Sequence, residues 1–388
     1  MIARRTNTFS SLNFSDNAGW RCRNKVCWRK SLARCVCLLA LFCCAQPHAQ
    51  SYRLVVVADE LRWPWSIARL PDGSFLVTER EGRLLRVNPD GSRRVLAGTP
   101  QTLFAGQGGF FDIVLHPEFE ENKIIYLSYA EGTETANGVA VFRARLDEGV
   151  LLHGEQLLRI DPDKSTPQHY GGRMLFVAGG NLLLSTGDGF EMREEAQSRY
   201  SELGKILRVD DDGNPAGTKD STGKEVSRLW TLGHRNPQGM VQIPHNGMVL
   251  SHEHGPKGGD ELNLLIPGAN YGWPAVTHGV DYSGAYVSPF KRAQGMEDPL
   301  WIWTPSIAPS GMAWYSGNRF PEWRNSLLIG ALVNREVRRL QLYEGAIVNE
   351  EALFSELGER IRDVRVYDED IYLLTDGEQG QLIHVQTR

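Results

Sequence analysis

The sequence predicts an all-β fold, specifically a six-bladed β-propeller. Six similar fragments recur along the chain, each an apolar strand followed by a small or polar residue and a charged turn. Their mean interval of about 60 residues is typical of propeller blades with long loops. Helical periodicity is scarce, and only the stretch from Glu194 to Leu203 is a fair helix candidate. Two packed sheets are the alternative, because regularly spaced short strands also fit a β-sandwich.

The six fragments define the expected blades in chain order. Each has an anchor in its apolar strand: Leu76, Ile125, Leu183, Val249, Leu328 and Tyr372. In a propeller the innermost strand of each blade ends at a central channel, so the residues that follow these strands converge at one mouth. We expect Asp188, His252, Glu253 and Asp376 to lie there.

The first 49 residues predict a secretory signal peptide. Residues 21–34 are basic, an apolar run follows from Cys35 to Ala45, and Ala49 closes the segment. About 20 apolar residues are needed to cross a bilayer, so this run is too short for a membrane span. Lipidation at Cys43 or Cys44 is an alternative. We therefore expect a periplasmic or secreted protein whose single propeller domain covers residues 50–388.

The composition of residues 50–388 restricts the partners of this domain. All six cysteines lie before residue 45, so the domain has no disulfide framework. It holds 34 Lys and Arg against 46 Asp and Glu, a formal charge of −12. Nucleic acid is therefore not an expected partner. No linker or low-complexity segment divides the domain.

Residues 251–273, SHEHGPKGGDELNLLIPGANYGW, concentrate histidines, carboxylates and tight turns. A strand runs into a Gly-Pro turn, which leaves the carbonyls of Gly255 and Pro256 free to face a hard cation such as calcium. An ordinary glycine-rich loop is the alternative. Zinc is another, because His252 and His254 share one strand face, although no further soft ligands follow at zinc-like spacing.

Three further motifs are dense in polar groups. In residues 105–109, three glycines accompany Gln107 and allow the backbone to approach a ligand closely. His169 precedes a Gly-Gly-Arg sequence, and Asp188 at the end of the next strand could orient it as a general base; an ordinary structural His-Asp pair is the alternative. Arg235 and Asn236 precede a proline, so extended geometry would project their side chains as planar donors.

Taken together, these motifs resemble the soluble quinoprotein aldose sugar dehydrogenases of the glucose/sorbosone dehydrogenase family. The resemblance covers essentially all of residues 50–388. It is carried by GQGG at 106, HYGGR at 169, STGDG at 185, GHRNPQG at 233, HEHGPKGGDELN at 252, NYGWP at 270, PSIAPSGMAWY at 305 and RIRDV at 360. It implies a six-bladed propeller that binds pyrroloquinoline quinone (PQQ) and calcium at the channel mouth and oxidises an aldose.

The resemblance also implies roles for individual residues. His169 would accept the proton of the anomeric hydroxyl, with Asp188 orienting it and Arg235 directed at the quinone oxygen of the cofactor. Gly255 and Pro256 would supply carbonyl ligands to the catalytic calcium, and Glu261 and the carbonyl of Tyr271 would hold a second, structural calcium. The positions that match cofactor contacts are Gln107, Arg235, Asn236, Tyr282, Arg360 and Arg362.

Two departures from the family pattern stand near this site. Related sequences commonly read Ala-Leu-Lys where this chain reads Ala331-Leu332-Val333, so an expected cation is missing, and Arg335 is a possible substitute. The glucose dehydrogenase branch has an aspartate where this chain has Gln168. The preferred sugar, the electron acceptor and the oligomeric state stay open.

Two other functions fit a six-bladed propeller. A metal-dependent sugar lactonase would hold its metal with side-chain carboxylates from several blades and would not need the cationic GHRNPQG and RIRDV motifs. A non-catalytic binding module would not bind PQQ, and the valine at position 333 is its only support.

Overall fold

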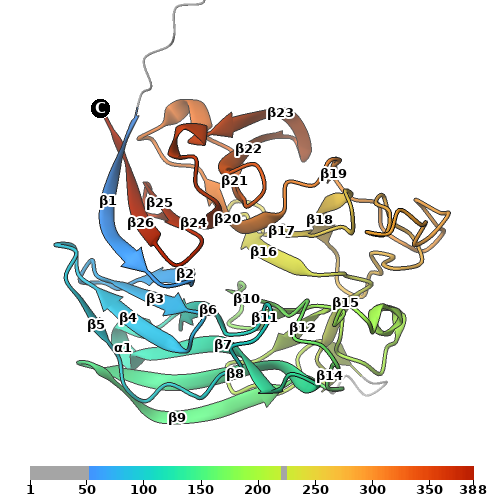
Figure 1. Ribbon diagram of the computed structural model, residues 1–388, viewed down its shortest axis with the longest axis horizontal. Coiled ribbons are helices and arrows are strands. Elements are labelled where there is room, and N and C mark those ends of the chain that lie inside the picture. Colours follow the sequence, from blue (N-terminus) through green and yellow to red (C-terminus); the bar gives the residue numbers. More distant parts are fainter. Residues whose placement is uncertain (1–51, 220–224) are drawn as a thin grey trace, which may run out of the picture. The chain divides into compact units, whose positions relative to one another are not determined.

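Six four-stranded antiparallel sheets form a ring around a central axis in the computed structural model, which describes residues 52–219 and 225–388 (Figure 1). The six-bladed β-propeller predicted from the repeats is therefore confirmed. The predicted signal peptide, residues 1–49, lies outside the described residues. Within the described part of the chain, no helix has the length and apolar character needed to cross a membrane.

Each blade is built from strands that follow one another in the chain, except where the termini meet. Blades one to three comprise β2 (Pro64–Arg69), β3 (Phe75–Glu79), β4 (Arg83–Val87) and β5 (Arg93–Val95); β6 (Phe110–Leu115), β7 (Ile124–Thr133), β8 (Ala136–Asp147) and β9 (Val150–Arg159); and β10 (Gly171–Phe176), β11 (Leu182–Thr186), β12 (Lys205–Val209) and β15 (Leu229–Leu232). Blades four to six comprise β16 (Pro237–Gln242), β17 (Val249–Glu253), β18 (Asp260–Leu265) and β19 (Trp301–Trp303); β20 (Pro309–Tyr315), β21 (Ser326–Ala331), β22 (Glu336–Tyr343) and β23 (Ala346–Leu353); and β24 (Ile361–Tyr367), β25 (Asp370–Thr375), β26 (Gly380–Thr387) and β1 (Tyr52–Leu61).

The sixth blade closes the ring by joining the two ends of the domain. Strand β1 pairs antiparallel with β26, from Tyr52 opposite Thr387 to Leu61 opposite Gly380. Figure 1 shows this pair as the blue and red strands lying side by side. The six inner strands also contact their neighbours in an unbroken circle, so the sheet edges nearest the channel are covered.

The hydrophobic core is divided into six clusters, one between each pair of neighbouring blades. Alternate residues of the second strands enter different clusters. Leu182 and Leu184 pack toward the second blade, whereas Leu183 packs toward the fourth. A strand covered on both faces needs apolar side chains on both, which explains why the repeats read as continuous apolar runs.

The repeat anchors lie in the second strand of each blade, β3, β7, β11, β17, β21 and β25. This position corrects one expectation. Asp188, Glu253 and Asp376 lie at the ends of second strands, not of inner strands. Because neighbouring strands are antiparallel, the mouth is formed where each inner strand begins and the second strand ends.

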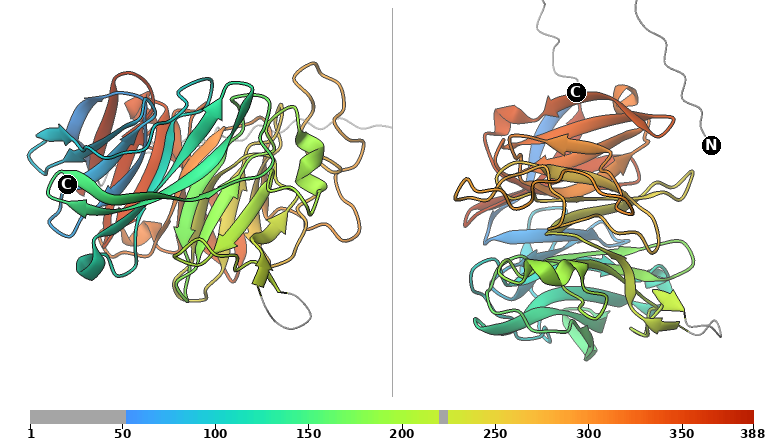
Figure 2. Two further views of the ribbon diagram at one scale, coloured as in Figure 1. Left: turned by 90° about the horizontal axis from the view of Figure 1, so that it is seen from below. Right: turned by 90° about the vertical axis from the view of Figure 1, so that its right-hand side faces the viewer.

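Helices are few and short among the described residues. They are α1 (Phe119–Asn122), η1 (Arg193–Gln197), η2 (Pro321–Trp323) and η3 (Ser355–Leu357), and a small hairpin joins β13 (Thr218–Lys219) to β14 (Glu225–Ser227). The helix predicted from Glu194 to Leu203 is wrong in extent, because only the 3-10 turn η1 forms. Figure 2 shows η1 beside the long connection between β18 and β19. Gln197 joins them by donating to the carbonyl of Trp273 at 2.7 Å.

Candidate active site

A buried histidine and aspartate of the third blade lie together at the channel mouth. His169 ends the loop before β10, and Asp188 follows β11 of the same blade. The distance from His169 Nδ1 to Asp188 Oδ1 is 2.7 Å. The indole of Trp273 and the main-chain N–H of Phe190 also donate to the Asp188 carboxylate, at 2.7 and 2.8 Å. The carboxylate therefore has three donors and a fixed orientation.

The electrostatics of this couple favour an ionised aspartate and a neutral imidazole. Burial tends to raise the pKa of Asp188, but the hydrogen bond from His169 and the charges of His169 and Arg235 outweigh it and lower the pKa. Burial lowers the pKa of His169, with the charge of Arg235 acting in the same direction. An ionised Asp188 accepts the Nδ1 proton, so the lone pair of the neutral ring lies on Nε2.

Neighbouring loops fix the backbone around His169. Gln107 Oε1 accepts the N–H of His169 at 2.9 Å, and Asn236 Oδ1 accepts the N–H of Gly171 at 3.0 Å. These side chains come from the connection before β6 and from the residue before β16, so three blades position one histidine. The extended geometry before the proline had suggested that Arg235 and Asn236 project outward. Both residues are buried instead.

Arg235 is 4% exposed and its hydrogen-bonding capacity is only partly used. One terminal nitrogen donates to the carbonyl of His254 at 3.2 Å, and the guanidinium lies 5.3 Å from the Trp273 ring centroid. Its Nε has no partner among the described residues. A buried donor without a partner is costly, which indicates that an acceptor belongs beside it.

These residues line two cavities. The first, of about 350 Å³, is lined by the predicted residues Gln107, Asn236, Arg360 and Arg362. The second, of about 360 Å³, is lined by His169, Asp188, Arg235, Pro256 and Tyr282. The hydrogen bond from His169 to Gln107 joins their walls. All the residues predicted to act in catalysis and cofactor binding therefore line one of two cavities whose walls are joined.

Asp376 links the two predicted arginines of the first cavity. Its carboxylate accepts from Arg360 Nε at 3.0 Å and from Arg362 Nε at 3.3 Å. Burial tends to raise the pKa of Asp376, yet the two arginines lower it. Val333 also lines this cavity and is 59% exposed. Arg335 lies outside the lining and donates to the carbonyl of Gly358 at 2.8 Å, so it does not replace the expected lysine.

The Gly-Pro turn has free carbonyl oxygens, as expected. In the described parts of the chain, neither the carbonyl of Gly255 nor that of Pro256 accepts a hydrogen bond. The turn is anchored by the buried Asp260, whose Oδ1 accepts the N–H of Gly255 at 2.9 Å. Its Oδ2 accepts the main-chain N–H groups of Ile307 and Ala308 at 2.9 and 3.0 Å. One carboxylate thereby joins the turn to the loop before β20.

Glu261 and Tyr271 lie in a second oxygen-rich cluster. Glu253 and Glu261 are opposite each other on β17 and β18. Burial, followed by the charge of Glu253, raises the pKa of Glu261 to about 8. His234 connects this pair to Tyr271, because its Nδ1 lies 2.9 Å from Glu253 and its ring stacks on the tyrosine. Asn263 bridges the carboxylates, and its buried Oδ1 has no partner among the described residues.

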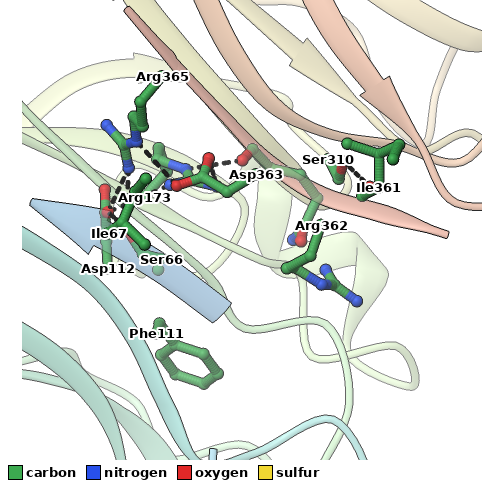
Figure 3. Close-up of polar contacts among 12 residues, drawn as sticks. Ser66, Ile67, Phe111, Asp112, Arg173, Ser310, Ile361, Arg362, Asp363 and Arg365 are labelled. Carbon is green, nitrogen blue, oxygen red and sulfur yellow. Dashed lines mark hydrogen bonds and ion pairs between the residues drawn. The ribbon is translucent and has the colours of Figure 1, made fainter. Parts of the chain in front are cut away.

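The channel below the mouth holds an ionic network that the sequence analysis did not find. Asp112 and Asp363 are the third residues of β6 and β24, and Arg173 is the third residue of β10. Arg173 contacts Asp112 at 3.1 Å and Asp363 at 3.3 Å, and Arg365 contacts the same carboxylates at 2.7 and 2.8 Å (Figure 3).

The same third position holds a small residue in the other three blades, Ser66, Gly239 and Gly311. A Cβ on Gly239 would lie 2.3 Å from the His252 ring, and one on Gly311 would lie 2.0 Å from Asp363. The small residues thus leave space for the large polar ones. This pattern of large polar and small residues at the third position can be recognised only after the inner strands of the six blades have been aligned.

The comparisons with known proteins agree with this fold. Residues 61–384 match the family model described as Glucose / Sorbosone dehydrogenase. The aldose sugar dehydrogenase of Escherichia coli is 37% identical over 346 residues, covering 86% of this chain and 92% of its own. A crystal structure of a glucose dehydrogenase has a TM-score of 0.83 and 39% identity, covering 87% of this chain and all of its own.

A PQQ-bound structure is also similar. The aldose sugar dehydrogenase of Streptomyces coelicolor, in its PQQ-bound form, has a TM-score of 0.72 and 27% identity. The match covers 87% of this chain and 98% of that protein. The likeness therefore extends over most of this chain and nearly all of that protein.

Proposed function

We propose that this chain, a sugar dehydrogenase that belongs to the glucose/sorbosone dehydrogenase family, uses PQQ and calcium to oxidise the anomeric hydroxyl of an aldose to a lactone. The observation that carries the proposal is the His169–Asp188 couple beside an arginine-lined cavity. A base beside an anion-binding cavity suits this reaction. The base takes the proton from the sugar hydroxyl, and the hydride leaves C1 for an anionic cofactor held in the cavity.

His169 is the base in this proposal. Its Nε2 forms no hydrogen bond with the described residues, and its ring lines the second cavity. The anomeric hydroxyl of the sugar donates to Nε2, which takes the proton as the C1–H bond breaks. Asp188 stabilises the imidazolium that forms, because the carboxylate already accepts the Nδ1 proton. The N–H of Trp273 keeps that carboxylate in place.

The residues of the mouth fit PQQ. PQQ is a tricarboxylate, and the first cavity presents Arg360 and Arg362 with one counter-carboxylate between them. The unpartnered Nε of Arg235 suits an anionic oxygen, and Gln107, Asn236 and the exposed Tyr282 complete the polar wall. When bound, PQQ would supply the acceptor for the hydride.

Calcium fits the two oxygen-rich clusters. The free carbonyls of Gly255 and Pro256 suit a cation whose coordination shell another ligand completes, because calcium takes six to eight oxygens. When bound there, calcium would supply a Lewis acid. Glu261, the carbonyl of Tyr271 and the unpartnered Asn263 Oδ1 suit the second, structural ion. A divalent cation there would favour the ionised form of Glu261, whose pKa burial and the charge of Glu253 raise to about 8.

Export to the periplasm or the medium is part of the proposal. It rests on the basic segment, the apolar run and the small residue before position 50. Sequencing the N-terminus of the protein recovered from the periplasm or medium tests it. A mature terminus near residue 50 is expected, and retention of residues 1–49 in an exported protein would contradict the proposed cleavage.

Matched assays distinguish the dehydrogenase from a lactonase and from a binding module. The purified protein is supplied with PQQ, calcium and a redox dye, and glucose and other aldoses are added. A second sample receives gluconolactone, and its hydrolysis is followed. Dye reduction that needs the sugar, PQQ and calcium supports the proposal. Lactone hydrolysis without dye reduction would establish the lactonase, and neither activity would favour the binding module.

A further inference from the structure

An additional arginine, Arg80, lies in the first cavity and belongs to no motif of the sequence analysis. It follows β3, at the mouth end of the second strand of blade one. Its Nε and Nη2 donate to the carbonyl of Gly108 at 3.2 and 2.9 Å, and Nη2 also donates to Gly106 at 2.6 Å. The side chain is therefore held against the loop that carries Gln107.

The charge of Arg80 is not compensated by an ion pair among the described residues. Asp376, the only carboxylate in the lining of this cavity, pairs with Arg360 and Arg362. Three arginines therefore face one carboxylate. Burial lowers the pKa of Arg80, and the charge of Arg362 lowers it further, whereas the charge of Asp376 raises it. These groups are therefore within electrostatic reach of one another. Two positive charges in excess in a partly buried cavity favour an anionic occupant.

The Nη1 group of Arg80 forms no hydrogen bond with the described residues. A guanidinium fixed at two nitrogens and free at the third is preorganised to bind a carboxylate. Val333, where the family resemblance had led us to expect a lysine, lines the same cavity and brings no charge. Arg335 brings none either, because it lies outside the lining.

We propose that Arg80 binds a carboxylate of PQQ and supplies the positive charge that is missing at Val333. The inference rests on the proposed function, since it assumes that PQQ occupies this cavity. It assigns Arg80 two connected tasks. The guanidinium holds the Gln107 loop, whose side chain accepts the N–H of His169, and it completes the cationic wall of the cofactor site.

Equilibrium titration of PQQ, followed by its absorbance or fluorescence in the presence of calcium, tests the inference without turnover. Arg80→Gln removes the charge and keeps an amide donor on a shorter side chain. We expect its Kd for PQQ to rise about tenfold, the scale of a charge-assisted hydrogen bond. The loss should shrink at high salt. Arg335→Gln is the matched control, an arginine bound to a carbonyl outside the cavity, and its Kd should not change.

Two further variants separate charge from loop clamping. Arg80→Lys keeps the charge but loses the fork, and we expect it to bind PQQ more tightly than Arg80→Gln. Val333→Lys, added to Arg80→Gln, should restore most of the affinity because it returns a cation to the same cavity. Equal loss in Arg80→Lys and Arg80→Gln, with no rescue by Val333→Lys, would show a purely structural role and overturn the inference.

The remaining outcomes separate this inference from the proposed function. The melting temperature shows whether Arg80→Gln is folded. If the wild type binds PQQ and folded Arg80→Gln binds it equally well, the role of Arg80 alone is overturned. A wild-type protein that does not bind PQQ at all overturns both.

Discussion

The channel network and the channel mouth are both rich in buried charge, but they differ in how that charge is satisfied. In the channel, Asp112 and Asp363 each contact Arg173 and Arg365, so two anions balance two cations within the protein. At the mouth, Arg235 keeps an unpartnered Nε and Arg80 has no ion-pair partner in the described chain. Asp363 Oδ1 contacts Arg173 without forming a hydrogen bond, so the channel network is balanced in charge but not fully hydrogen-bonded. The comparison teaches that charges paired within the protein join the blades, whereas charges without a protein partner indicate a ligand site.

The largest expected effect on stability comes from removing one cation of the channel network. Arg173→Met leaves two buried carboxylates with one cation fewer and should lower the free energy of unfolding by roughly 3–5 kcal/mol. Arg145→Met is the control, because Arg145 pairs with Asp147 on the surface and should cost no more than about 1 kcal/mol. Denaturant titration measures both. If both variants lost about 1 kcal/mol or less of the free energy of unfolding, the buried channel network would stabilise the fold no more than a surface ion pair does.

Replacing the base at the mouth should lower the rate of sugar oxidation far more than it lowers stability, because Asp188 loses one of its three donors but keeps Trp273 and the N–H of Phe190. His169→Ala is expected to lower the rate of sugar oxidation by roughly 10²-fold or more, the usual scale for a general base. Binding of PQQ should persist, since the cationic residues remain. Steady-state assays with dye and a parallel PQQ titration check this prediction. A near wild-type rate would show that another group takes the proton.

Calcium should bind the oxygen-rich cluster around Glu261 and stabilise the fold. At a calcium concentration 100 times its Kd, binding adds about 2.7 kcal/mol to the free energy of unfolding. In Glu261→Gln a carboxylate ligand is replaced by a weaker amide oxygen, so calcium should raise the melting temperature much less. Thermal unfolding with calcium and with a chelator measures the difference. Equal melting temperatures in both conditions would contradict a structural ion in the wild type.

The pH dependence of sugar oxidation should reflect the environment of His169. The base must be neutral to accept a proton, and burial lowers its pKa below the ordinary value of 6.5. Neutral imidazole therefore persists to lower pH than in a free histidine, and the acid limb of kcat/KM should lie below pH 6.5. A limb above that value would mean that the imidazolium is stabilised in the free enzyme.

The sequence predicted the six blades because the second strands are buried on both faces and read as continuous apolar runs. It also identified most of the mouth, since His169, Asp188 and Arg235 stand in short local motifs. Two features could not be found this way. The network of Asp112, Arg173, Asp363 and Arg365 depends on the alignment of inner strands from different blades. Arg80 stands in a charged turn, Glu-Arg-Glu-Gly, which reads as a solvated surface until the fold brings it to the cavity.

Anaerobic spectral titration tests the central claim most directly, namely that the open polar groups of the mouth hold PQQ beside His169. PQQ is added to wild type and to His169→Ala with calcium present, and an aldose is then added without any electron acceptor. We expect both proteins to bind PQQ and only the wild type to convert it rapidly to the reduced spectrum. Absence of PQQ binding to the wild type, or equally fast reduction in His169→Ala, would contradict the account.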